Sequence, residues 1–161
     1  MFSYTDSFNQ DLSNWDVSNV TTMERMFYSA DNFNQDIGDW NVSNVNDMSY
    51  MFSYTEDFNQ DISDWDTSSV TDMTNMFASS ERFNQDISDW DVSSVTNMGW
   101  IFFRAERFNQ DISHWDVSNV TDMRNMFHDV DLSDDNKCAI HSSFDSNDNW
   151  PYDWESFCSD E

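Results

Sequence analysis

Acidic side chains that recur at a fixed spacing are the first residues that could carry chemistry. Five aspartates stand 25 residues apart, and they are Asp11, Asp36, Asp61, Asp86 and Asp111. In stacked units neighbouring carboxylates would lie about 4.8 Å apart and repel one another. Such a row could bind Ca²⁺ through oxygen ligands, or its carboxylates could accept hydrogen bonds from Ser and backbone N–H groups in bends. EF-hand spacing is absent, so we favour the second interpretation and keep Ca²⁺ as the alternative, with no other cofactor predicted.

Histidine and cysteine side chains form no catalytic pattern. His114, His128 and His141 share neither a repeat position nor a ligand spacing, and neither cysteine is flanked by a nucleophile motif. The chain has 2 Gly and lacks a glycine-rich phosphate loop. Carboxylate pairs occur in every unit, whereas an active site is normally unique. The sequence therefore predicts a protein that is not an enzyme.

Tryptophan and side-chain amides also recur every 25 residues. The column that begins at Trp15 could stack on sugars, but its regular place beside Val and Ile favours the core. The Asn9 and Gln10 columns could recognise a ligand. Their identity in every unit favours amide ladders that satisfy one another's hydrogen bonds.

Positions that vary between otherwise similar units are candidates for binding. The 3rd, 4th, 7th, 24th and 25th places of the units differ, and several carry large aromatic or arginine side chains. Such side chains are typical of interface hot spots, while drift on a solvated face is the alternative. The candidate binding residues are Tyr28, Tyr50, Tyr54, Trp100, Phe103, Arg104 and Arg107.

These columns require repeated elements to position them. Read in rows of 25, the chain contains five full units over residues 1–125, and a sixth opens with Met126 and Phe127. Nine positions are identical in all five units. This period is typical of stacked repeat proteins, in which a single unit cannot bury its own apolar face.

The spacing within a unit predicts the secondary structure. Apolar residues at i, i+3, i+6 and i+7 predict a short helix over residues 70–77, and the pattern over residues 60–63 predicts a brief strand. We therefore expect an α/β repeat solenoid, a leucine-rich-repeat-like stack of short parallel strands and short helices over residues 1–127. Residues 128–161 are the expected C-terminal cap, with a helix beginning after Ser133.

The repeat resembles that of a known group of proteins. The units FNQDISDWDTSSVTDMTNMF (58–77) and FNQDISHWDVSNVTDMRNMF (108–127) resemble the BspA-like leucine-rich-repeat surface proteins. The resemblance implies a non-catalytic, secreted or cell-surface module for adhesion or for protein or glycan binding. It brings no catalytic residue with it.

The two cysteines lie in the expected cap. An even pair confined to this segment, together with the family context, favours a Cys138–Cys158 disulfide and an extracellular or cell-surface location. Two free thiols in a cytosolic protein are the alternative.

Charge and the N-terminal residues bear on the partners. A formal net charge of −26 repels phosphate backbones, so nucleic acid is excluded as a partner, and no apolar run is long enough for membrane insertion. Met1 and Phe2 fall on the Met-Phe columns of the repeat without a cap or leader, so we expect a mature fragment with an open first unit. That open face suggests self-stacking. A structural subunit that assembles end to end and an ice-, mineral- or Ca²⁺-binding acidic solenoid are therefore the alternative functions.

Overall fold

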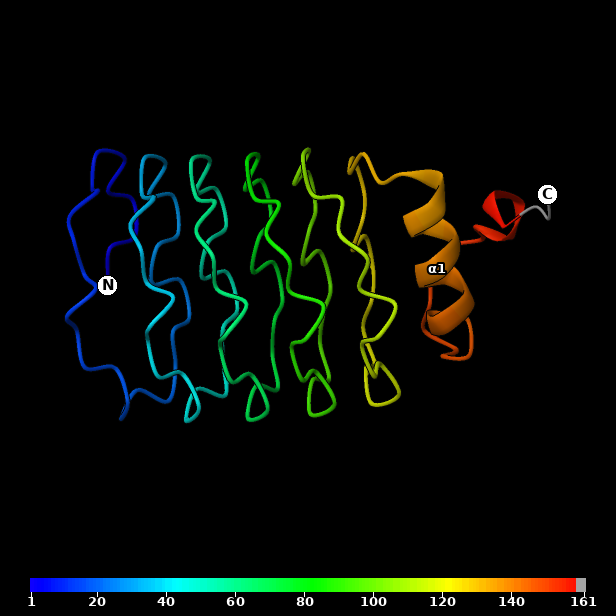
Figure 1. Ribbon diagram of the computed structural model, residues 1–161, viewed down its shortest axis with the longest axis horizontal. Helices are drawn as coiled ribbons and strands as arrows, with labels where there is room; N and C mark the ends of the chain where they lie inside the picture. Colours follow the sequence, from blue (N-terminus) through cyan, green and yellow to red (C-terminus); the bar gives the residue numbers. More distant parts are fainter. Residues whose placement is uncertain (159–161) are drawn as a thin grey trace.

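The computed structural model describes residues 1–158 and consists of a row of coils that lie side by side along the long axis (Figure 1). Each coil corresponds to one 25-residue unit, because backbone hydrogen bonds join residues about 25 positions apart. The α-helix α1 (Asp134–Phe144) lies at the far end of the row, and the 3-10 helix η1 (Glu155–Phe157) follows it.

The predicted α/β repeat solenoid, with its leucine-rich-repeat-like stack of short parallel strands and short helices, is wrong. Residues 1–158 contain one α-helix, one 3-10 helix and no β-strand. Parallel pairing in this part of the chain is limited to isolated bridges, one between each pair of neighbouring coils from the first to the fifth. In the segment 70–77, residues 74–77 form turns and Asp72 forms isolated bridges, and the segment 60–63 is irregular up to the turn that begins at Ser63.

Backbone hydrogen bonds explain why turns replace the expected helix. The N–H of Met76 donates to the carbonyl of Met73 at 3.1 Å, three residues back, and this bond closes a turn. The N–H groups of Met73 and Phe77 donate instead to carbonyl groups of the next coil, both at 2.9 Å. A helix would need these donors for its own i→i−4 bonds. The apolar spacing is therefore produced by successive turns whose free N–H groups join neighbouring coils.

Phenylalanine and tryptophan fill the interior of the coils. One phenylalanine column has rings stacked at 5.6–5.8 Å between centroids, and it consists of Phe27, Phe52, Phe77 and Phe102. A second column packs directly against the first, with 4.0 Å between the ring centroids of Phe52 and Phe58. These side chains are fully buried. The core is therefore continuous from coil to coil, so each coil buries the apolar face of its neighbour.

The helix expected after Ser133 is confirmed. The Ser133 side chain accepts a hydrogen bond from the backbone N–H of Asn136, and α1 buries Ile140 and Phe144. Further along, the Tyr152 hydroxyl accepts the backbone N–H of Phe127 at 2.9 Å. The C-terminal segment thus satisfies a donor of the last coil that has no following coil to bind.

Candidate functional site

Two positions of the repeat adopt a left-handed backbone conformation in coil after coil. The 25th residue of a unit and the 4th residue of the next have φ between 53° and 59°, and no glycine has a positive φ in the described chain. Glycine adopts this region far more readily than bulky residues do. Here Tyr50, Tyr54, Trp100 and Arg104 occupy it. Large side chains are thus held on strained turns, which natural proteins retain mainly at functional positions.

These turns are aligned along one side of the stack. The N–H of Tyr4 donates to the carbonyl of Tyr28 at 2.8 Å between the first two coils, and Arg104 donates to His128 at 2.9 Å between the last two. Equivalent bonds connect the coils between them. We call the residues at unit positions 24, 25, 3 and 4 the variable face.

The N-terminal half of the variable face is a group of tyrosines. The ring of Tyr28 lies 5.2 Å from that of Tyr4, 6.3 Å from Tyr50 and 5.7 Å from Tyr54, always at a steep angle. The guanidinium of Arg25 lies 4.7 Å from the ring centre of Tyr50. Partial burial, followed by the neighbouring tyrosines Tyr4 and Tyr54, raises the pKa of Tyr28.

The C-terminal half combines aromatic rings with cations. The Phe103 ring stacks on His128 at 5.3 Å, and the Arg124 guanidinium lies 4.8 Å from the ring centre of Trp100. Arg124 also donates to both carboxylate oxygens of Asp122, at 2.9 and 2.7 Å. These bonds lower the pKa of Asp122. Arginine is therefore held in place over the indole by a carboxylate at the edge of the face.

The variable face has a charge unlike that of the rest of the molecule. It carries three of the chain's six Lys and Arg residues but only two of its 32 acidic residues, Glu24 and Asp129. Depletion of Asp and Glu with enrichment of Tyr, Trp, Phe and Arg is the composition of protein interfaces. This face is therefore the strongest candidate for a binding surface.

The aspartate columns close local bends. The Asp61 carboxylate accepts the backbone N–H of Ser63 at 3.0 Å and its hydroxyl at 2.7 Å. The backbone bond and then the side-chain bond lower the pKa of Asp61, and the equivalent bonds lower that of Asp86. Among the described residues, no group of three or more His, Cys, Asp or Glu side chains is placed to hold a metal ion. The geometry agrees with the hydrogen-bond acceptors that we favour for this column.

The amide and tryptophan columns are parts of the framework. The Asn59 side-chain oxygen accepts the backbone N–H and the side-chain amide of the next coil, from Asn84 and Gln85, both at 2.9 Å. Each buried tryptophan donates its indole N–H to the preceding coil, as from Trp65 to Ile37 at 3.1 Å. The ladder and the core position predicted for these columns are confirmed.

The first coil exposes what the others bury. Trp15 is 41% exposed, whereas the equivalent Trp40 is 4% exposed. An apolar hollow on this side is lined by Met1, Trp15, Val17 and Met26, among others. This exposed surface bears on self-association, considered below.

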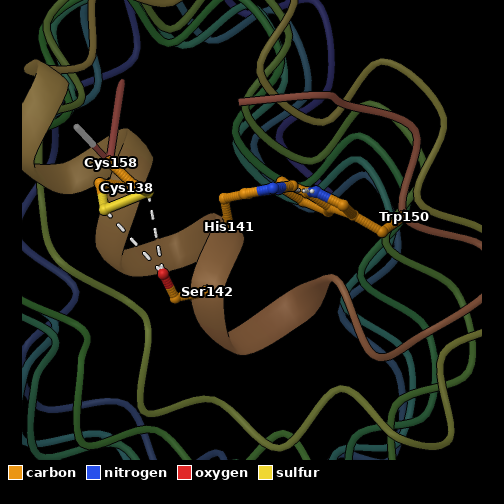
Figure 2. Close-up of a disulfide and its surroundings, with 5 residues drawn as sticks. All are labelled: Cys138, His141, Ser142, Trp150 and Cys158. Atoms are coloured by element: carbon orange, nitrogen blue, oxygen red, sulfur yellow. Dashed lines mark hydrogen bonds between the residues drawn. A yellow bond between two sulfur atoms is a disulfide. The ribbon is translucent and has the colours of Figure 1, made fainter. Parts of the chain in front are cut away.

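The C-terminal segment is fastened by the predicted disulfide, Cys138–Cys158, which is confirmed. Figure 2 shows it at α1, with Ser142 beside it and His141 reaching toward Trp150. The Ser142 hydroxyl oxygen lies 3.9 Å from the sulfur of Cys138 and 3.8 Å from the sulfur of Cys158. The indole N–H of Trp150 donates to Nδ1 of His141 at 3.0 Å. This nitrogen must be unprotonated to accept the bond. His141 therefore fixes the aromatic segment in place.

The repeated part of the chain matches a known protein family. Residues 1–79 and 55–146 each match the model of a family described as "Mycoplasma protein of unknown function, DUF285". The chain belongs to this family. The two DUF285 matches overlap over residues 55–79, the length of one repeat, and the second extends through α1. No curated protein and no solved structure matches the chain significantly. Membership is consistent with a BspA-type repeat protein, and the family description states no function.

Six of the seven predicted binding residues lie on the variable face, and Arg107 does not. It lies three residues beyond Arg104, at the seventh place of its unit, and its backbone N–H donates to the carbonyl of Glu81 at 3.3 Å. Arg25 and His128 were missed as candidates. Arg25 occupies the variable 25th place and was recognisable, while His128 follows the point where the period fails.

Proposed function

We propose that this DUF285 member is a non-catalytic binding module that acts at the cell surface or outside the cell and engages a protein or glycan through its variable face. The observation that carries the proposal is the scarcity of acidic side chains on a face rich in aromatic and arginine residues, on a chain of net charge −26. Placement of Tyr, Trp and Arg on left-handed turns supports it further, because glycine would adopt this backbone conformation at a lower conformational energy.

Two further features support the location and the absence of catalysis in this proposal. The Cys138–Cys158 disulfide is typical of oxidising compartments. His141 is held by Trp150, whose indole N–H donates to its Nδ1 at 3.0 Å. No helix within residues 1–158 is both long and apolar enough to cross a bilayer.

A screen against extracellular proteins and glycans, followed by variants, tests the proposed function. Trp100→Ala combined with Tyr54→Ala should abolish binding of whichever partner the screen finds. Asp64→Ala combined with Asp89→Ala, both exposed on the acidic surface, is the control and should leave binding intact. Loss of binding in the control alone would overturn the proposal.

Self-association through the first coil is the second candidate function. The exposed Trp15 and its apolar surroundings favour it. Sedimentation over a range of concentrations distinguishes the two functions, because end-to-end assembly requires a mass that grows with concentration. Trp15→Lys should abolish such growth, and a constant monomer mass would remove this candidate.

A further inference from the structure

The tyrosine cluster on the N-terminal half of the variable face presents aromatic rings at different angles to a ligand. We define the cluster as Tyr4, Tyr28, Tyr50 and Tyr54. Their rings surround Tyr28 at interplanar angles of 64–72°, and two of them are open to solvent, Tyr4 at 75% and Tyr54 at 47% exposed. Rings at different angles present several π faces to one incoming group.

Rings on this face already seat cations from the chain itself. The guanidinium carbon of Arg25 lies 4.7 Å from the ring centre of Tyr50, and that of Arg124 lies 4.8 Å from Trp100. The π face attracts ammonium and guanidinium groups electrostatically. The exposed rings of Tyr4 and Tyr54 have no cation over them in the described chain.

A row of carboxylates follows the cluster two residues further along each coil. This acidic row is Asp6, Asp31, Glu56, Glu81 and Glu106. Partial desolvation, and after it the negative charges of Glu81 and Asp31, raise the pKa of Glu56. Arg82 bonds Asp57 at 2.9 Å, next to the row. The charge of Arg82 acts on Glu56 in the opposite sense, so the row is partly compensated there but keeps a net negative charge. The field of the whole molecule attracts cations and repels anions.

We propose that the tyrosine cluster and the acidic row together bind a lysine- or arginine-bearing segment of a basic protein. The cationic head groups lie over the open tyrosine rings and are balanced by the carboxylates of the row. This inference rests on the proposed function, because it names the partner chemistry of the same face. A neutral glycan would use the rings alone and gain nothing from the carboxylates.

The probe is a synthetic peptide of repeated Lys-Gly-Ser units, titrated against the full chain at low salt. Tyr54→Phe keeps the π face and should keep the affinity. Tyr54→Leu keeps apolar bulk without a π face and should weaken binding about two- to fivefold, the range for an exposed cation–π contact. Because Tyr54 is 47% exposed, both variants should fold, and unfolding curves check this.

Two variants that each remove one negative charge test whether the acidic row contributes more than the general attraction of the chain for cations. Glu56→Gln and Asp89→Asn each remove one negative charge from an exposed residue, but only Glu56 belongs to the row. Binding should weaken more for Glu56→Gln. A peptide with acetylated lysines should not bind.

Three results would overturn the proposal. They are equal affinity for Tyr54→Leu and Tyr54→Phe, equal losses for Glu56→Gln and Asp89→Asn, and undiminished binding of the acetylated peptide. Tyr54-dependent binding of neutral oligosaccharides without binding of the lysine peptide would identify a glycan site instead. In that case the proposed function survives, since the variants at Trp100 and Tyr54 test it with a partner of any chemistry.

Discussion

At the scale of single residues, each aspartate of the column from Asp11 to Asp111 makes the same local hydrogen bond. Its carboxylate accepts the backbone N–H two residues ahead, at 2.9–3.1 Å. The side chain therefore replaces the turn chemistry that glycine or proline supplies elsewhere. This explains how a chain with 2 Gly and 1 Pro can turn so often.

Substitution at Asp61 separates the hydrogen bond from the charge. Asp61→Asn keeps an acceptor and removes one charge from the column. Weaker hydrogen bonds and weaker repulsion then oppose each other, so the free energy of unfolding should change little. Asp61→Ala removes the acceptor and should cost roughly 0.5–1.5 kcal/mol. Urea unfolding measures both. A large loss for Asn would show that the negative charge itself is required.

A second residue-scale prediction uses equivalent tryptophans in different surroundings. Trp65→Phe removes the 3.1 Å bond to the Ile37 carbonyl and part of a side chain that is 3% exposed. It should cost roughly 1–3 kcal/mol. Trp15→Phe alters a side chain that is 41% exposed and should cost less than about 0.5 kcal/mol. Equal losses in denaturant unfolding would contradict a core built by coil-to-coil contact.

At the scale of elements, α1 continues the coil ladder by different means. The Asn109 side-chain oxygen, which in other coils receives an asparagine N–H and a glutamine amide, here receives the Ser133 N–H and the Asn136 amide, at 2.9 and 2.8 Å. The Asn147 amide donates to the carbonyls of Val117 and Val120 at 2.8 and 3.0 Å. The C-terminal segment is thus matched to the end of the stack.

Removal of the disulfide should weaken this segment. Cys138→Ser combined with Cys158→Ser opens a loop with a sequence separation of 20, which should cost about 3 kcal/mol if the segment unfolds with the stack. Thermal unfolding followed by circular dichroism should show a lower Tm. Ser142→Ala, beside both sulfurs, is the control and should be neutral. Two titratable thiols in the native protein would contradict the disulfide itself.

At the scale of the whole molecule, charge dominates the response to conditions. Outside the variable face the chain carries 30 of its 32 acidic residues and three of its six Lys and Arg residues, and such self-repulsion destabilises a compact state. Hydrogen bonds oppose this effect at individual aspartates, because they favour the charged form and lower the pKa of Asp16, Asp61 and Asp91.

These two effects predict a stability maximum at mildly acidic pH. As pH falls from 7 to about 5, protonation of groups with raised pKa, such as Glu56, relieves repulsion and Tm should rise at low salt. Carboxylates whose pKa is lowered in the folded state stabilise the fold at pH values above their ordinary pKa of 3.8. This contribution is lost as the pH falls through their lower folded-state pKa, so Tm should then drop. About 1 M NaCl, with a Debye length near 3 Å, should flatten the rise. A Tm that falls steadily from pH 7 at low salt would contradict this balance.

The sequence alone determined the features that follow from strict repetition. A period of 25 places equal residues in register, so the buried tryptophan column and the amide ladder could be predicted without knowing the backbone path. The helix after Ser133 was predictable for a local reason, because a serine N-cap signals it in a few residues. The disulfide followed from two cysteines in one short segment.

Only the tertiary structure decided the conformation within each coil. Apolar residues at i, i+3, i+6 and i+7 fit a helix and a run of turns equally well, and the choice depends on where N–H groups such as that of Met73 find acceptors. Those acceptors belong to the next coil, 24 residues away in sequence. The variable face arose in the same way. Sequence variation marked Tyr28 and Tyr54, but coil stacking brought their ring centres to a distance of 5.7 Å.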